Sequence, residues 1–160
     1  MKILIVDDEP LARARLRTLI GGLAMAGVEV VGEAVDGVDA ILAHESAPVD
    51  AVLLDIAMPR MDGLEAARHL AALEQPPAVI FCTAFDEHAL AAFEAHAVDY
   101  LVKPVSRERL RIAIERARKF TAEQIRRIGD EVRQESRSHI CARIRGSLRL
   151  VPIGEIAYFL

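Results

Sequence analysis

The 160-residue sequence has no tryptophan, only two cysteines and few aromatic residues, which make up 4% of the chain. It also lacks any apolar run of the ~18 residues that a membrane-spanning helix needs. Residues 1–8 turn acidic too early to form a secretory signal. Cys82 and Cys141 show no metal-ligand spacing. These absences predict a cytoplasmic protein in a reducing environment, without a membrane partner.

Apolar residues make up 52% of the chain and charged residues 28%, a balance typical of a folded domain with an aliphatic core. The length fits one domain, or one domain with a short appendix. Residues 1–119 carry 13 basic and 19 acidic side chains, whereas residues 120–160 carry seven basic and five acidic ones. The first part is therefore not a nucleic-acid surface overall.

Short apolar runs predict the strands of a sheet. Residues 3–6, 49–54 and 78–82 are almost continuously apolar, which is typical of parallel strands that helices cover on both faces. Residues 28–34 and 99–102 are more mixed and fit strands nearer the edges.

Helical patterns lie between these runs. Pro10 suits a first helical turn, and Asp36, Asp62, Asp86 and Ser106 each precede an apolar face and are expected to act as N-caps. Strand and helix thus alternate five times, ending near residue 119. This alternation predicts an α/β three-layer sandwich of right-handed βαβ units.

A different pattern follows. Residues 120–137 are charge-rich and predict a helical extension or linker, weakened at Gly129. From His139 apolar residues alternate with period two, Gly146–Ser147 is a hairpin-turn signal, and residues 153–160 resemble the entry to another strand. The expected organisation is a first domain, a helical linker and the incomplete start of a β-rich domain, at residues 1–119, 120–137 and 138–160.

Carboxylates follow two of the predicted strands directly. Asp7 and Asp8 come after the first strand and Asp55 after the third, so on neighbouring strands they would converge. Converging like charges repel, and Mg²⁺, which prefers oxygen ligands, relieves the repulsion. Thr83 and Lys103 follow the next two strands, and a hydroxyl and an ammonium there suit a phosphoryl group. An aspartate in this setting can attack phosphorus.

Each of these residues alone has an ordinary explanation. A single aspartate after a strand is more often a cap or turn residue, and a single threonine or lysine there is usually structural. The joint pattern is far more specific: an acidic pair follows the first predicted strand, Asp the third, Thr the fourth and Lys-Pro the fifth.

The motifs resemble the receiver domain of two-component response regulators. The stretches that carry the resemblance are Asp7-Asp8-Glu9-Pro10, the ten residues 54–63 (LDIAMPRMDG), Thr83-Ala84 and Lys103-Pro104. The resemblance covers residues 1–119 and implies a flavodoxin-like (βα)5 fold with sheet order 2-1-3-4-5.

The resemblance also implies roles for individual residues. Asp55 corresponds to the phosphoacceptor. Asp8 and Asp55 correspond to direct Mg²⁺ ligands, with Asp7 acting largely through water and the backbone carbonyl of Ala57 completing the protein ligands. The phosphoryl donor is then a separate sensor histidine kinase, and the chain is a switch and not an enzyme.

Further positions match the family pattern. Thr83 and Lys103 would contact the phosphoryl group, Tyr100 occupies the aromatic switch position, and Lys103–Pro104 matches a cis peptide. Ala57 and Phe85 occupy variable positions that influence phosphoryl lifetime. Phosphorylation is expected to promote a homodimer.

Residues 83–93 and 97–104 resemble the LytTR-type branch, similar to alginate and autolysis regulators, whose effector is a β-rich DNA-binding domain. Residues 138–160 resemble its first strands. The intact parent is then a transcription regulator, and DNA binding requires the C-terminal domain missing from this chain.

Two other function classes stay open on the residues alone. One is a Mg²⁺-dependent phosphohydrolase with an aspartate nucleophile, although Asp7 and Asp8 are adjacent where haloacid-dehalogenase-like enzymes separate two aspartates. The other is a passive interaction module, which the intact acidic set and Lys103 disfavour. A dinucleotide-binding domain is disfavoured because no Gly-x-Gly-x-x-Gly follows the first strand.

Overall fold

The computed structural model describes residues 1–144 and 147–152. Its elements are, in chain order, β1 (Lys2–Val6), α1 (Pro10–Leu23), β2 (Glu29–Ala34), α2 (Gly37–Ser46), β3 (Ala51–Leu54), α3 (Gly63–Ala71), β4 (Ala78–Thr83), the 3₁₀ turn η1 (Asp86–His88), α4 (Ala89–Glu94), β5 (Asp99–Val102), α5 (Arg107–Ser138), β6 (His139–Ile144) and β7 (Ser147–Pro152).

The first five strands form one parallel sheet in the order β2-β1-β3-β4-β5, which confirms the predicted topology. The three continuously apolar runs occupy the centre of the sheet and the two mixed runs its edges, as the sequence predicts. Central strands are covered on both faces, which is why β3 and β4 are buried at every position.

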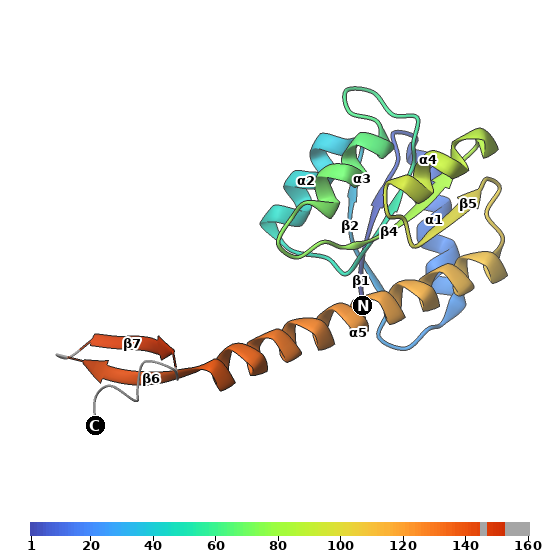
Figure 1. Ribbon diagram of the computed structural model, residues 1–160. Coiled ribbons are helices and arrows are strands. Elements are labelled where there is room, and N and C mark those ends of the chain that lie inside the picture. The colour runs from blue at the N-terminus through green and yellow to red at the C-terminus, as the bar shows by residue number, and fades with distance from the viewer. Residues whose placement is uncertain (145–146, 153–160) are drawn as a thin grey trace. The chain divides into compact units, whose positions relative to one another are not determined.

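Helices cover both faces of the sheet (Figure 1). One apolar cluster joins alternate strand residues such as Ile5 and Ile80 to Leu16 of α1 and Ile114 of α5. The other cluster joins the remaining strand residues to α2, α3 and α4, for example through Leu70. The predicted three-layer sandwich is confirmed, and Phe81 is the one aromatic side chain among the buried hydrophobic residues whose burial the structure describes.

Helix starts follow the predicted caps at three of four positions. Asp36 and Asp62 accept from the backbone N–H groups of the third residues beyond them, and Ser106 accepts from the N–H of Arg109. The expectation for Asp86 is wrong. Asp86 begins the 3₁₀ turn η1, and α4 starts only at Ala89, because a tighter turn precedes the helix here.

The chain divides into two compact units, Met1–Thr121 and Ala122–Leu160. Helix α5 runs unbroken through Gly129 to Ser138, so this glycine does not end the helix. In the second unit β6 and β7 pair antiparallel, with Ile144 opposite Ser147. The expected turn residue Gly146 and the expected strand entry at 153–160 lie outside the described residues. None of the described helices has both the length and the apolar composition of a membrane span.

Candidate functional site

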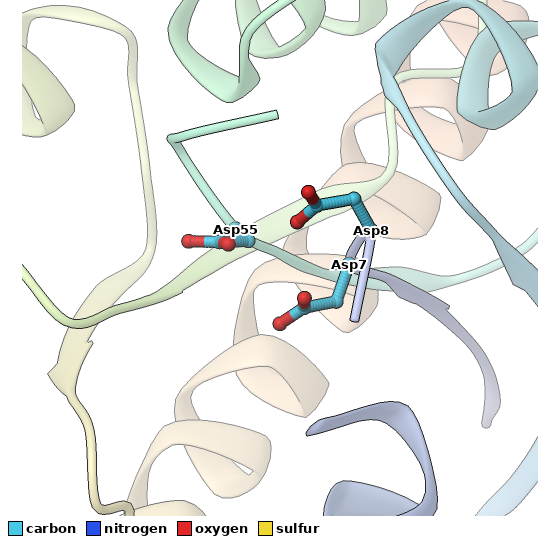
Figure 2. A group of neighbouring side chains, drawn as sticks. All are labelled: Asp7, Asp8 and Asp55. Atoms are coloured by element: carbon cyan, nitrogen blue, oxygen red, sulfur yellow. The ribbon is translucent and has the colours of Figure 1, made fainter. Parts of the chain in front are cut away.

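The carboxyl ends of β1 and β3 bring three carboxylates together. These strands are neighbours, with Val6 opposite Leu54, so Asp7 and Asp55 leave the sheet side by side. One carboxylate oxygen from each of Asp7, Asp8 and Asp55 lies within 4.8 Å of the others, and the three side chains border one space (Figure 2). The predicted convergence of the acidic residues is therefore present.

The three carboxylates differ in exposure. Asp7 and Asp55 are buried, whereas Asp8 is exposed. Burial raises the pKa of the Asp55 carboxyl above its ordinary value, and the negative charge of Asp7 acts in the same direction. The positive charge of Lys103 opposes both effects. Because the pKa is raised overall, the positive charge of Lys103 does not fully offset the burial of Asp55 and the neighbouring negative charge.

Lys103 reaches the cluster from the end of β5. Its Nζ lies 2.6 Å from Asp7 Oδ2 and 3.6 Å from Asp55 Oδ2. Burial acts to lower the pKa of this ammonium, but the hydrogen bond to Asp7 and the nearby carboxylates raise it overall. The Lys103–Pro104 peptide is cis, as the resemblance implies. Lys103 is therefore a fixed positive charge at the edge of the cluster.

Thr83 ends β4 and its side chain is fully buried. Its Oγ1 accepts a hydrogen bond from the N–H of Phe85 at 3.4 Å. Hydrogen bonding to this hydroxyl also contributes to lowering the pKa of Asp55. The hydroxyl is therefore next to the carboxylate that the sequence singles out.

Asp7 and Asp8 have different hydrogen-bonding states. Both oxygens of Asp7 are engaged, Oδ1 by the N–H of Glu9 at 2.9 Å and Oδ2 by Lys103. Asp8 makes no hydrogen bond or ion pair in the part of the chain that the structure describes. The carboxylate oxygens of Asp8 are thus available to bind an incoming group, whereas both carboxylate oxygens of Asp7 already accept hydrogen bonds.

The donor chemistry fits a hard divalent cation. Asp7, Asp8 and Asp55 each offer a carboxylate oxygen at one place, and Mg²⁺ binds few protein oxygens while keeping several waters. A cavity of about 430 Å³ adjoins the cluster and is lined by Asp55, Ala57, Phe85 and Lys103 among others. This cavity leaves room for a phosphoryl group over Asp55.

Tyr100 lies in β5, at the edge of the sheet, and β4 separates this strand from β3, the strand that precedes Asp55. Its ring centroid is 6.3 Å from that of Phe81, at an interplanar angle of 51°. Its hydroxyl donates to the carbonyl oxygen of Phe85. Tyr100 is thus connected to the β4–η1 segment that also carries Thr83.

Two contacts, one beside the site and one at the opposite edge of the sheet, could not be predicted from the sequence. Arg13 of α1 donates to the backbone carbonyl of Asp7, and its partner Glu33 lies in β2. His44 is buried near the end of α2, where its ring contacts Val49 and Gln75. Both contacts cross between elements, so neither periodicity nor local motifs could have revealed them.

Comparison with known proteins identifies the domain type. Residues 3–115 match the family model for the response regulator receiver domain. The chain is 46% identical over 164 aligned positions to the positive alginate biosynthesis regulatory protein of Pseudomonas aeruginosa, covering 100% of this chain and 65% of that protein. It is 44% identical over 124 positions to the transcriptional regulatory protein BtsR of Escherichia coli, covering 78% of this chain and 51% of that protein.

Solved structures give the same result for the fold. The response regulatory domain of protein mrkE from Klebsiella pneumoniae is similar with a TM-score of 0.69 and 35% identity, covering 77% of this chain and 99% of that one. The receiver domain of AraT from Geobacillus stearothermophilus gives a TM-score of 0.66 and 34% identity, covering 77% and 97%. The chain spans less than two thirds of the length of the curated relatives described above.

Proposed function

Because the chain belongs to the response regulator receiver family, we propose that Asp55 accepts a phosphoryl group from a sensor histidine kinase. Receivers are signalling proteins of two-component systems and not enzymes in the ordinary sense. The observation that carries the proposal is the meeting of three carboxylates and the Lys103 ammonium at adjoining strand ends, beside an open cavity.

Mg²⁺ is the cation of the proposal. Asp8, Asp55 and the backbone carbonyl of Ala57 would hold it, with Asp7 acting through water; the engaged oxygens of Asp7 support this division. When bound, the cation neutralises charge on the carboxylates and on the phosphoryl oxygens.

Asp55, Lys103 and Thr83 take part directly in the transfer of the phosphoryl group. A carboxylate oxygen of Asp55 attacks phosphorus in line, a new P–O bond forms, and the P–N bond to the donor histidine breaks with its electron pair staying on the imidazole. Lys103, 3.6 Å from Asp55, moves its charge toward the new phosphoryl oxygens. The Thr83 hydroxyl donates a hydrogen bond to the same group.

Phosphorylation is read out through Thr83 and Tyr100 in this proposal. When Thr83 moves toward the phosphoryl group, it shifts the position of the segment between β4 and η1, because the Phe85 N–H donates to the Thr83 hydroxyl. The carbonyl of Phe85 accepts a hydrogen bond from the Tyr100 hydroxyl, so the shift reaches Tyr100. The ring of Tyr100 then turns inward and favours a dimer that uses the α4, β5 and α5 surface. If Tyr100→Ala leaves phosphorylation-linked dimerisation unchanged, this step is wrong.

The larger protein is part of the proposal. We assign residues 1–119 to the receiver, residues 120–137 to a helical linker and residues 138–160 to the start of a LytTR-type DNA-binding domain. The names of the relatives, which are regulators of alginate biosynthesis and of transcription, support a DNA-binding parent. A cytoplasmic location is proposed with it.

The test is a comparison of protein adduct and released phosphate. The chain is incubated with acetyl phosphate and Mg²⁺, and both products are followed with time. A receiver accumulates up to one phosphoryl group per chain and does not act on unrelated phosphate esters. Many turnovers of phosphate release from such esters would instead support the phosphohydrolase, and no adduct on a folded chain would support a passive module.

A further inference from the structure

We propose that Arg13 is a positioning residue for the cation site, fixing the peptide group between Asp7 and Asp8 so that the Asp8 carboxylate faces Asp55. This inference rests on the proposed function, because it assigns Asp8 to the cation. Arg13 lies on α1, whereas the other residues of the proposed site lie at or just after the ends of strands.

The contacts of Arg13 span three elements. Its Nη1 donates to the backbone carbonyl oxygen of Asp7 at 2.8 Å. Its Nε donates to Glu33 Oε2 in β2 at 2.9 Å. The side chain is only 15% exposed, so the planar guanidinium is enclosed between these two partners. Arg13 thus links the segment after β1 to the edge strand of the sheet.

The Asp7 carbonyl belongs to the same peptide group as the N–H of Asp8. Asp7 itself is fixed on both sides, by its N–H to the Ala34 carbonyl at 3.1 Å and by its engaged carboxylate. The Asp8 side chain has no partner of its own among the described residues. Its direction therefore depends on the backbone, and Arg13 holds the carbonyl that sets the orientation of that backbone.

Glu33 keeps Arg13 in place. Its carboxylate is bound by two arginines, since Arg17 Nε donates to Oε1 at 2.9 Å. Hydrogen bonds from Arg17 and then Arg13 lower the pKa of Glu33, so it remains a carboxylate at neutral pH. Outer partners that orient metal ligands change metal affinity by roughly 10–100-fold when removed. Arg13 is placed to have an effect of this kind on Asp8.

Arg17 provides a matched control. It lies one turn further along α1, carries the same charge and binds the same carboxylate, but it makes no contact with Asp7 in the described structure. Electrostatics alone predict that removing either arginine slightly tightens cation binding, because a positive charge near the site is lost. If Arg13 positions Asp8, removing Arg13 instead weakens cation binding, whereas removing Arg17 does not weaken it.

The experiment measures Mg²⁺ binding by calorimetry, without phosphodonor, for wild type, Arg13→Met, Arg17→Met and Asp8→Asn. We expect Arg13→Met to weaken binding roughly tenfold and Arg17→Met to leave it unchanged or slightly tighter. In metal-free protein, the NMR order parameter of the Asp8 amide should fall in Arg13→Met only. If Arg13→Met does not fold, Arg13→Lys serves instead, because one ammonium cannot hold both partners of the guanidinium fork.

The outcomes separate the two proposals. If Asp8→Asn binds Mg²⁺ as wild type does, or wild type binds none, the assignment of the cation site is wrong. If wild type binds, Asp8→Asn does not, and Arg13→Met matches Arg17→Met, the positioning role of Arg13 is overturned while the proposed function stands.

Discussion

Gly63 lies directly against the backbone of Asp55. A β-carbon added at Gly63 would come within 2.0 Å of the Asp55 carbonyl oxygen, and the Gly63 N–H donates to the carbonyl of Ile56 at 2.8 Å. The first turn of α3 therefore packs on the peptide that carries the proposed phosphoacceptor. Only a residue without a side chain fits this approach.

Gly63→Ala is expected to destabilise the fold by about 2–3 kcal/mol, because the methyl group meets backbone atoms that cannot move aside cheaply. Urea denaturation measures the change. Gly21→Ala is the control, since nothing lies within 4 Å of a β-carbon there and alanine favours helix by about 1 kcal/mol. A Gly63→Ala protein as stable as wild type would contradict the close packing.

The apolar pattern predicts the central strands and the edge of the sheet that carries the acidic residues, whereas the order of the strands is implied by the family resemblance. Parallel strands that are buried on both faces are continuously apolar, so their ends are sharp, and residues after those ends share one edge of the sheet. The pattern therefore places Asp7 and Asp55 at the same edge of the sheet, and the strand order implied by the resemblance makes them neighbours. The caps at Asp36 and Asp62 are equally local, because each side chain bonds its own helix.

Other features depend on contacts between distant segments, and the sequence does not reveal them. Arg13 meets Glu33 only because α1 packs beside β2, and the environment of His44 depends on the segment before β4. Asp86 is of a residue type that often caps helices, but it begins a 3₁₀ turn. The choice between a 3₁₀ turn and an α-helix depends on small backbone differences that the identity of one residue does not determine.

His44 holds two backbone groups in a buried position. Its Nδ1 accepts from the N–H of Val49 at 3.1 Å, so Nε2 carries the proton and donates to the Gln75 carbonyl at 2.9 Å. His44→Leu leaves the Val49 N–H without a partner and should cost about 2 kcal/mol in thermal or urea unfolding. His69→Leu, on an exposed part of α3, should stay within about 0.5 kcal/mol of wild type. Equal effects of the two substitutions would contradict this role.

The buried Asp36 carboxyl is expected to make the stability of the fold depend on pH. A hydrogen bond from the Asp39 N–H lowers the pKa of the buried Asp36 carboxyl against the opposing effect of burial, and Arg60 lowers it further. A lowered folded-state pKa means that the carboxylate stabilises the fold above the unfolded value and that this contribution disappears as pH falls through the folded value.

Between neutral pH and pH 3, wild type should therefore lose more free energy of unfolding than Asp36→Asn, which cannot titrate but still caps α2. Urea midpoints at several pH values measure the difference. Asp39→Asn, which changes a more exposed partner of the same arginine, is the matched charge control. Identical slopes for wild type and Asp36→Asn would show that Asp36 does not contribute.

The acidic cluster costs stability when no cation is bound. Because burial and then the Asp7 charge raise the pKa of Asp55, keeping it ionised at neutral pH is unfavourable in the folded state. In buffer with a chelator, Asp55→Asn should therefore raise the free energy of unfolding. Added Mg²⁺ should stabilise wild type more than the variant.

Asp62→Asn is the control for this substitution, because asparagine caps a helix as well as aspartate does and Asp62 is exposed. It should change neither the stability nor the Mg²⁺ response by more than about 0.5 kcal/mol. A loss of stability in Asp55→Asn without Mg²⁺ would mean that the three carboxylates do not repel.

The most direct test of the account is the intact mass of wild type and Asp55→Asn after incubation with acetyl phosphate, with Mg²⁺ and with a chelator in its place. We predict one added phosphoryl group on wild type with Mg²⁺, and none on wild type with chelator or on the variant in either buffer. An equal adduct on folded Asp55→Asn, or no adduct on folded wild type with Mg²⁺, would contradict the assignment of Asp55 as the phosphoacceptor.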